Sequence, residues 1–339
     1  MERLLITGAT GFIGRLLVPE IIKQFSGIRI LTINRHAGKA TNIFPFEQCV
    51  HIEGLQTDVI QRFNPEIAIH LATLNGVENC LSCIKPMIET NITFGTELLN
   101  ILGDCPAFKL FVNTGSFSEF ASGTRQIHDA YLYAATKSAF RVLLAYYARI
   151  KGFKYITATP YSVYGGKPSV KRLMDYLIES LHAEHPVAMT GGEQILDFIH
   201  INDVVSFYIT LLNHPTLFDA LQNGEEFHLG TGTGTSIRQL AAMIEERSGK
   251  TCNIQWGGRP YRAQDIMYAV APISENQGVI DWQANITLAQ GLSYPPSEGG
   301  RGGYPPSEGA GGGCLPSEGG GGGKVPPFEK PTLINSTLK

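Results

Sequence analysis

Short apolar runs rich in β-branched residues recur along the first half of the chain and alternate with amphipathic stretches. The runs that predict strands are residues 3–8, 28–34, 49–54, 66–73, 109–115 and 154–160. The stretches that predict helices between them include residues 12–25, 87–103 and 134–151. Strands that are apolar on both faces and alternate with helices indicate a parallel sheet with right-handed crossovers. The expected fold class is therefore α/β, with a doubly wound parallel sheet.

Composition and charge narrow the function classes. The chain has 339 residues, of which 43% are hydrophobic, and a formal net charge of −3. This charge gives no reason to expect nucleic acid or an anionic membrane as a partner. No apolar run reaches the length of a membrane span, and the first residues lack the layout of a signal peptide. With six scattered cysteines, these features predict a cytoplasmic protein with reduced thiols.

A glycine-rich turn follows the first predicted strand. The sequence GATGFIG spaces Gly8, Gly11 and Gly14 as GxxGxxG, between a strand and a helix. Such glycines let the backbone approach a pyrophosphate, which the N–H groups at the start of the helix then bind. The alternative is a tight strand–helix turn without a ligand. The expected dinucleotide contacts here are Gly8, Thr10, Gly11, Phe12, Ile13 and Gly14.

The end of the second predicted strand bears on the choice of cofactor. An acidic residue there would bind the adenosine ribose diol, but this chain has Asn34 and Arg35. A guanidinium group pairs well with a 2′-phosphate, whereas a solvated arginine at a strand end is the alternative. We therefore expect NADPH, with NAD as a possibility.

A tyrosine lies just before the helix predicted over 134–151, and a lysine within that helix follows it by four residues. Tyr133 and Lys137 would lie on one helix face, about one turn apart. A phenol has an ordinary pKa near 10, and an adjacent cation favours its ionised form. The spacing alone leaves two interpretations open, a surface pair or a proton donor beside a cation.

Together these motifs make the chain similar to the extended short-chain dehydrogenases/reductases of the nucleotide-sugar epimerase/dehydratase family. The similarity covers roughly residues 1–292. It includes IHLAT (69–73), ETNITFGTELLNIL (89–102), TPYSVYGG (159–166) and LDFIHINDVV (196–205). From this resemblance we expect further cofactor contacts at Leu71, Ala72, Thr73, Asn91, Tyr133, Lys137 and Tyr161.

The resemblance also implies a domain organisation. Residues 1–165 would form a Rossmann domain that binds the dinucleotide, and residues 197–220 would return to it. Residues 166–196 and 221–292 would form a smaller C-terminal lobe that binds the nucleotide sugar.

In this family the tyrosine exchanges a proton with the substrate oxygen. The lysine lowers the pKa of the tyrosine and holds the nicotinamide ribose, and a serine or threonine hydroxyl shares the substrate oxygen. The resemblance thus makes Tyr133 and Lys137 catalytic, with Thr114 as the expected hydroxyl and Ser116 as the second choice. The segment VNTGSFSEF can be aligned in more than one way.

The reaction class follows from finer resemblances. Sugar dehydratases carry Thr-Asp-Glu where this chain has Thr114, Gly115 and Ser116, so dehydration is not expected. NTGSF, LYAATKSAF and GGRPYRAQDIM resemble 4-ketoreductases such as CDP-abequose and CDP-paratose synthases, which act in deoxysugar biosynthesis. We expect NADPH-dependent reduction of a nucleotide-linked deoxy-4-ketohexose. The alternatives are a nucleotide-sugar 4-epimerase with tightly bound NAD and a non-catalytic dinucleotide-binding regulatory protein.

On the substrate side the expected contacts are Ser116, Ser162, Arg259 and Arg262, the arginines being suited to a diphosphate. Leu196 stands where the family usually has an arginine. Lys171 and Arg172 are weaker candidates, with solvated surface as the alternative. His200 is expected in the core rather than in catalysis, and no metal site is expected.

The cysteine spacing, the C-terminal repeats and the surfaces of two helices give three further expectations. Cys80 and Cys83 form a CxxC without a second ligand pair, so we interpret them as helix residues. Residues 293–339 carry three Pro/Gly-rich repeats and are expected to be disordered, in our hypothesis a replacement of the native end. Members of the family that this chain resembles commonly dimerise through two helices, which implies a homodimer through 87–103 and 134–150; the second helix is apolar on more than one side, with burial within one chain as the alternative.

Overall fold

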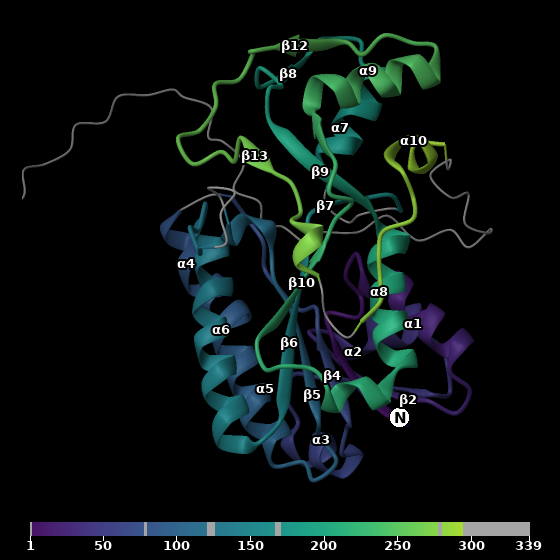
Figure 1. The fold of residues 1–339 in the computed structure, drawn as a ribbon, viewed down its shortest axis with the longest axis vertical. Coiled ribbons are helices and arrows are strands. Elements are labelled where there is room, and N and C mark those ends of the chain that lie inside the picture. Colours follow the sequence, from purple (N-terminus) through teal and green to yellow (C-terminus); the bar gives the residue numbers. More distant parts are fainter. Residues whose placement is uncertain (1, 78–79, 121–125, 167–170, 277–279, 294–339) are drawn as a thin grey trace, which may run out of the picture. The chain divides into compact units, whose positions relative to one another are not determined.

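In the computed structural model, residues 2–77, 80–120, 126–166, 171–276 and 280–293 are described. The main element is a seven-stranded sheet, with strand order β10-β6-β5-β4-β1-β2-β3 (Figure 1). Its strands are β1 Arg3–Thr7, β2 Arg29–Asn34, β3 Cys49–Glu53, β4 Ile67–His70, β5 Leu110–Thr114, β6 Lys154–Pro160 and β10 Glu225–Leu229. Every neighbouring pair is parallel, which confirms the doubly wound α/β fold.

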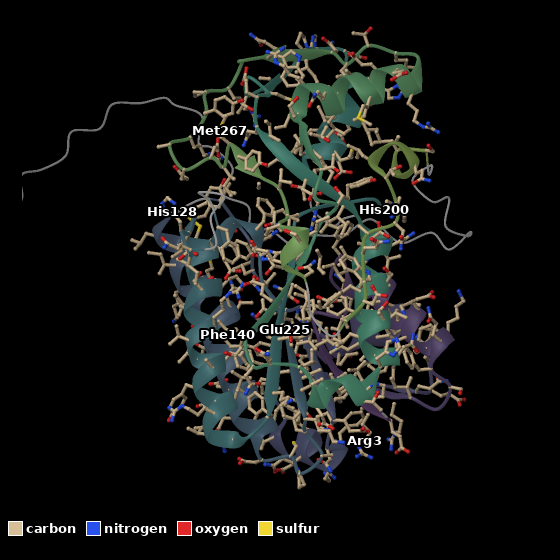
Figure 2. All side chains as sticks on the ribbon, viewed as in Figure 1. Arg3, His128, Phe140, His200, Glu225 and Met267 are labelled. Atoms are coloured by element: carbon tan, nitrogen blue, oxygen red, sulfur yellow. A yellow bond between two sulfur atoms is a disulfide. The ribbon has the colours of Figure 1, made fainter. Side chains whose placement is uncertain are left out.

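Helices cover both faces of this sheet. One core layer lies between the sheet and α1 (Gly14–Gln24) and α8 (Ile201–Asn213). The other contains residues of α3 (Thr57–Phe63), α5 (Phe94–Gly103) and α6 (Leu132–Lys151), including Phe140 (Figure 2). The remaining helices of this half are α2 (Ala37–Ile43), α4 (Leu81–Ile88) and the π-helical turn η1 (Glu89–Thr93). Apolar contact on both sides explains why these strands are almost uniformly hydrophobic.

A smaller group of elements carries the rest of the chain. A four-stranded sheet is made of β7 (Ser162–Tyr164), β9 (Ile195–His200), β11 (Gly234–Ser236) and β13 (Tyr268–Ala269). A two-stranded sheet pairs β8 (Val187–Met189) with β12 (Ile254–Trp256). The helices here are α7 (Leu173–Ser180), α9 (Ile237–Ser248) and α10 (Leu288–Gly291), and they share a third core with β7 and β9.

One expected boundary is wrong. We assigned residues 221–292 to the substrate lobe, yet β10 pairs with β6 and extends the main sheet. The strand is short and begins with Glu225 and Glu226, so its sequence lacks the apolar signal of the other strands. Because β10 lies at the edge of the sheet, its first residues need not be apolar.

Among the described residues, no helix combines the length and the apolar character needed to cross a membrane. The predicted disorder of the tail falls, apart from Ser293, outside the described residues.

Candidate active site

The glycine-rich turn lies against the loop that follows β4. Gly8 has a φ of +67°, and a Cβ there would lie 2.6 Å from the backbone of Leu71 and Ala72. The N–H of Ala72 donates to the hydroxyl of Thr7 at 3.1 Å, which holds this loop against β1. Only glycine permits both this φ and this approach. The turn therefore lies at the carboxyl ends of β1 and β4, where doubly wound sheets bind ligands.

The start of α1 also packs closely against the preceding turn. A Cβ on Gly14 would lie 2.4 Å from the carbonyl oxygen of Ala9, so the helix can approach the strand only with glycine. The N–H of Gly11 donates to the carbonyl of Gly8 at 2.9 Å, and Thr10, Phe12 and Ile13 complete the turn. An eleven-residue helix then begins, and no side chain caps its N-terminus. These residues fit the pyrophosphate of a dinucleotide.

At the end of β2, two neighbouring residues are suited to different groups of a cofactor. The side chain of Arg35 is exposed and makes no hydrogen bond or ion pair with any described residue. The amide of Asn34 donates to Thr32 and to the carbonyl of Ile52, but its buried Oδ1 has no partner within the described chain. The guanidinium suits a phosphate, and the Oδ1 suits a hydroxyl donor.

Asn91, an expected cofactor contact, is held by hydrogen bonds within the chain. Asn91 lies in the π-helical turn η1 and is 2% exposed. Its Oδ1 accepts from Thr73 and the N–H of Leu74, and its Nδ2 donates to the carbonyl of Leu74 and to Thr136. All its donors and acceptors are thereby used. Asn91 thus ties the loop after β4 to α6, and its contact with a cofactor stays a prediction.

The structure distinguishes the two hydroxyls that the sequence offered as partners of Tyr133. Thr73 and Ser116 act on the hydroxyl of Tyr133 and lower its pKa, against the larger effects of burial and of Glu119. The hydroxyl of Thr114 lies 3.2 Å from the Oη of Tyr208 on α8. Thr114, as the last residue of β5, places its side chain on the α8 side of the sheet. This geometry favours Ser116, the second choice, over Thr114, and the assignment of either hydroxyl stays a prediction.

Lys137 lies one turn further along the same face of α6. Its Nζ donates to the carbonyl of Thr114 at 2.9 Å, and the residue is 4% exposed. Burial lowers the pKa of Lys137 to about 8, against the effect of Glu119. Burial, with the charge of Glu119 second, raises the pKa of Tyr133 to about 12. In the chain by itself, then, burial outweighs the lowering of the tyrosine pKa that we expected from Lys137.

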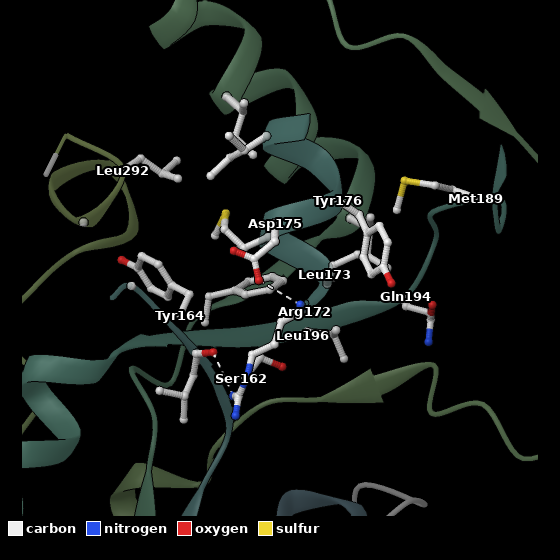
Figure 3. Close-up of a pocket in the computed structure, with 18 of the residues that line it drawn as sticks. Ser162, Tyr164, Arg172, Leu173, Asp175, Tyr176, Met189, Gln194, Leu196 and Leu292 are labelled. Carbon is white, nitrogen blue, oxygen red and sulfur yellow. Dashed lines mark hydrogen bonds between the residues drawn. The ribbon is translucent and has the colours of Figure 1, made fainter. Parts of the chain in front are cut away.

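A cavity of about 960 Å³ is lined by residues of the segments around this pair, such as Tyr131, although Tyr133 and Lys137 themselves are not among the lining residues. Its lining includes Phe12 of the glycine-rich turn, Phe117 after β5, and Tyr161 and Ser162 after β6, and it extends to α7, α9 and Leu292 (Figure 3). Tyr161 stacks on Phe117 with ring centroids 5.8 Å apart. The walls are predominantly apolar around a few polar groups, as in many small-molecule sites.

Arg172 is the cation most directly presented to this cavity. It precedes α7 and extends toward β7, where it donates to the carbonyl of Val163 at 3.4 Å (Figure 3). Its guanidinium lies 4.2 Å from the ring centroid of Phe12, and its charge acts on Tyr133. Its backbone N–H, rather than its guanidinium, is bonded to Asp175. Arg172 thus joins the glycine-rich turn to the cavity.

The other expected substrate residues divide into two groups. Ser162 and Arg259 line the cavity, as does His200. His200 is 5% exposed and accepts from the N–H of Asn202 at the start of α8, as expected for a core histidine. Arg262 is exposed, does not line the cavity formed by the described residues, and lies near Tyr131 and Asp265. Lys171 pairs with Glu179 on the surface.

The CxxC pair differs from expectation. Cys80 and Cys83 form a disulfide, with Cys80 immediately before α4 and Cys83 in its first turn. The expectation of reduced thiols is therefore wrong for this pair. Cys49, Cys105 and Cys252 are free. Spacing alone did not distinguish bonded from unbonded helix residues.

Sequence reasoning missed two charged residues behind the tyrosine. Glu119, three residues after Ser116, is fully buried, and its carboxylate pairs with Arg141 on α6. Arg141 follows Lys137 by four residues, so it lies on the helix face that carries the catalytic pair. That continuation of the Tyr133–Lys137 spacing was the signal available in the sequence.

Fold and site together define an α/β protein with a glycine-rich turn at the carboxyl ends of β1 and β4, a tyrosine–lysine pair on α6 and a cavity of about 960 Å³. Residues 4–230 match the model of the "NAD dependent epimerase/dehydratase family". The chain belongs to this family of extended short-chain dehydrogenases/reductases, whose members modify nucleotide sugars.

Curated relatives of different activity show similar identity. CDP-abequose synthase of Salmonella typhimurium is 27% identical over 302 residues, which span 86% of this chain and 96% of that protein. UDP-glucose 4-epimerase of Mycolicibacterium smegmatis is 25% identical over 313 residues, with the same two coverages. Identity alone therefore does not separate reduction from epimerisation.

Solved structures agree with the fold. UDP-glucuronic acid 4-epimerase from Bacillus cereus, in complex with UDP-glucuronic acid and NAD, superimposes with a TM-score of 0.74 at 20% identity. The match covers 86% of this chain and 96% of that one. DesIV, a dTDP-glucose 4,6-dehydratase from Streptomyces venezuelae with NAD and TYD bound, gives a TM-score of 0.73 at 16% identity, covering 86% and 94%.

Proposed function

We propose that this protein reduces the 4-keto group of a nucleotide-linked deoxy-4-ketohexose with NADPH. The observation that carries the proposal is Tyr133, whose hydroxyl is acted on by Ser116 and which lies one helical turn from Lys137 on α6. A phenol close to a second hydroxyl and a lysine is suited to give a proton to a carbonyl oxygen.

The residues of the chain supply the proton and its stabilisation. Bound NADPH supplies the hydride for the carbonyl carbon. Tyr133 donates its proton to the oxygen, so that the carbonyl becomes an alcohol. Ser116 donates a hydrogen bond to the same oxygen, and the Lys137 cation stabilises the phenolate that Tyr133 becomes.

Dehydration is disfavoured by the side chains that follow the hydroxyl. Elimination of water needs an acid and a base at the sugar, whereas the two residues after Ser116 are Phe117 and Ser118. The acid that follows, Glu119, is fully buried and paired with Arg141. No carboxylate from this turn is therefore presented to the substrate.

Charge at both ends of the site supports the proposed ligands. Arg35 is exposed at the end of β2, where the 2′-phosphate of NADPH would lie, and His36 and Lys39 are exposed close to it in the sequence. Arg172 and Arg259, both at the cavity, are suited to the diphosphate of the substrate. They would supply the cationic contact that Leu196, a cavity-lining residue, does not.

A 4-epimerase with bound NAD is the second candidate, and Asn34 favours it. The unpartnered Oδ1 of Asn34 is suited to accept a hydrogen bond from a ribose hydroxyl, which NADPH lacks at the 2′ position. The Tyr133–Ser116–Lys137 arrangement serves either reaction.

Product analysis tests the proposal. Purified protein is incubated with a panel of nucleotide 4-ketosugars and either NADPH or NADH, and the products are identified by NMR. Stoichiometric NADPH consumption with formation of a 4-hydroxy sugar supports reduction. Interconversion of two nucleotide hexoses without added cofactor would establish the epimerase instead, and dinucleotide binding without turnover would establish the regulatory alternative.

A further inference from the structure

Glu119 ends the short 3-10 turn η2 (Phe117–Glu119) directly behind the catalytic hydroxyls. Its side chain is fully buried, and its Oε1 accepts from the backbone N–H of Ser116 at 2.6 Å. The hydroxyl of Ser116 in turn lies 2.8 Å from that of Ser118. A single carboxylate thus fixes the backbone of the residue whose hydroxyl meets Tyr133.

Arg141 compensates the charge of this carboxylate. Its Nε donates to Oε2 of Glu119 at 2.5 Å. Its two terminal nitrogens donate to both carboxylate oxygens of Glu226 on β10, at 3.2 and 2.9 Å. Thr159 of β6 donates to Glu226 at 2.6 Å and completes the network. A buried carboxylate needs such a partner, because desolvation penalises its charged form.

The network adjoins the catalytic face of α6. Tyr133, Lys137 and Arg141 follow one another at intervals of four residues, and Glu119 lies opposite them. The negative charge of Glu119 raises the pKa of both Tyr133 and Lys137.

Other titratable or charged groups also face these residues. They are Arg172 before α7, Glu226 on β10, His70 on β4, which is buried with its pKa lowered to about 3, and Asp129, which reaches Glu119 through the hydroxyl of Ser138.

We propose that Glu119 is a positioning residue for the proton transfer. It holds Ser116 in place through the backbone N–H, and its ionised form, which Arg141 favours against the effect of burial, stabilises the cationic form of Lys137 and the protonated form of Tyr133. The proposal rests on the proposed role of Tyr133. Arg141 acts through Glu119, and Glu226 anchors the far side of Arg141 without contacting Ser116.

Glu119→Gln tests the charge, with Glu226→Gln as the matched control. Both variants remove one carboxylate from the same network, and Arg141 retains one partner in each. Because Glu119 raises both pKa values, its loss lowers them. The alkaline limb of the kcat profile of Glu119→Gln then moves to lower pH by about one unit, while KM is unchanged. Glu226→Gln keeps the wild-type limb.

Glu119→Asp tests the position. The charge is kept, but the shorter side chain no longer spans to the N–H of Ser116, so kcat falls about tenfold with the limb at its wild-type pH. If Glu119→Gln does not fold, Glu119→Asp alone tests the positioning role of Glu119. An unshifted limb in Glu119→Gln, an equal shift in Glu226→Gln, or wild-type kcat in Glu119→Asp would overturn the proposal.

The assay separates this proposal from the proposed function. The nucleotide sugar used is whichever one the wild-type protein turns over, in reduction or in epimerisation, since Tyr133 transfers the proton in both. The identity of the wild-type product tests the reaction. The ratio of kcat and the displacement of the alkaline limb between variants test Glu119.

Discussion

The hydroxyl of Thr114 lies 3.2 Å from the Oη of Tyr208 on α8, whereas that of Ser116, two residues later, acts on Tyr133 of α6 and lowers its pKa. Loss of the Ser116 hydroxyl and loss of the Thr114 hydroxyl should therefore have different effects. Ser116→Ala should lower kcat by about 10- to 100-fold, because one of the two groups that share the substrate oxygen is lost.

Thr114→Val is the matched variant. It removes the hydrogen bond to Tyr208 and should cost about 1–2 kcal/mol in the free energy of unfolding, because the buried hydroxyl of Tyr208 loses its partner. Its kcat should stay within about threefold of wild type. Kinetics and urea denaturation of both variants check the assignment, and a larger kcat loss in Thr114→Val would return the role to Thr114.

The pH dependence should be set by Lys137 rather than by Tyr133. Burial lowers the pKa of Lys137 to about 8 and raises that of Tyr133 to about 12. As pH rises, the lysine therefore loses its charge before the tyrosine loses its proton. In the free enzyme, kcat/KM should fall above about pH 8 with a slope of one proton. A profile that stays flat to pH 10 would contradict this order.

Arg35 should read the 2′-phosphate. Its side chain is exposed at the end of β2 without a described partner. Arg35→Ala should weaken NADPH binding by about 10-fold or more and leave NADH binding nearly unchanged, since only NADPH carries that phosphate. Titration calorimetry with both cofactors measures the difference. Equal losses would show that Arg35 does not contact the phosphate.

The expected homodimer through residues 87–103 and 134–150 stays a prediction, and the exposed side chains lead us to propose α4 in place of 87–103 as the partner of α6 in the interface. Val142, Tyr146 and Ile150 are 71%, 47% and 48% exposed and recur every four residues on α6. The exposed apolar residues of the neighbouring segment lie on α4, where Leu81 is 87% exposed, rather than across the whole of 87–103. Apolar stripes on two adjacent helices suit a partner surface.

Sedimentation should therefore give about twice the chain mass of 36.9 kDa. Val142→Glu should shift the protein toward monomer, because a charge at the centre of an apolar interface is desolvated without a partner. Val50→Glu, at an exposed apolar position on β3, is the control and should leave the mass unchanged. A wild-type monomer at micromolar concentration would refute the interface.

The sequence predicted the elements whose pattern is set by local physics. Six strands of the main sheet were foreseen because burial on both faces makes them apolar throughout, and Tyr133 and Lys137 because helical spacing fixes their common face. β10 was missed because an edge strand tolerates Glu225 and Glu226. The choice between Thr114 and Ser116 depends on how the chain turns after β5, which no periodicity encodes. The role of Asn91 depends on partners that lie 17 to 45 residues away in the sequence. The role of Glu119 depends on Arg141, which lies 22 residues away.

The most direct test of the central claim follows NADPH consumption by the wild-type protein and by Tyr133→Phe with the same nucleotide 4-ketosugar. The substitution keeps the ring and removes the proton donor. The account predicts conversion of the ketone to an alcohol by the wild type, a loss of at least about 100-fold in kcat for Tyr133→Phe, and unchanged NADPH affinity. Wild-type turnover in Tyr133→Phe, or no NADPH oxidation by the wild type with any 4-ketosugar, would contradict it.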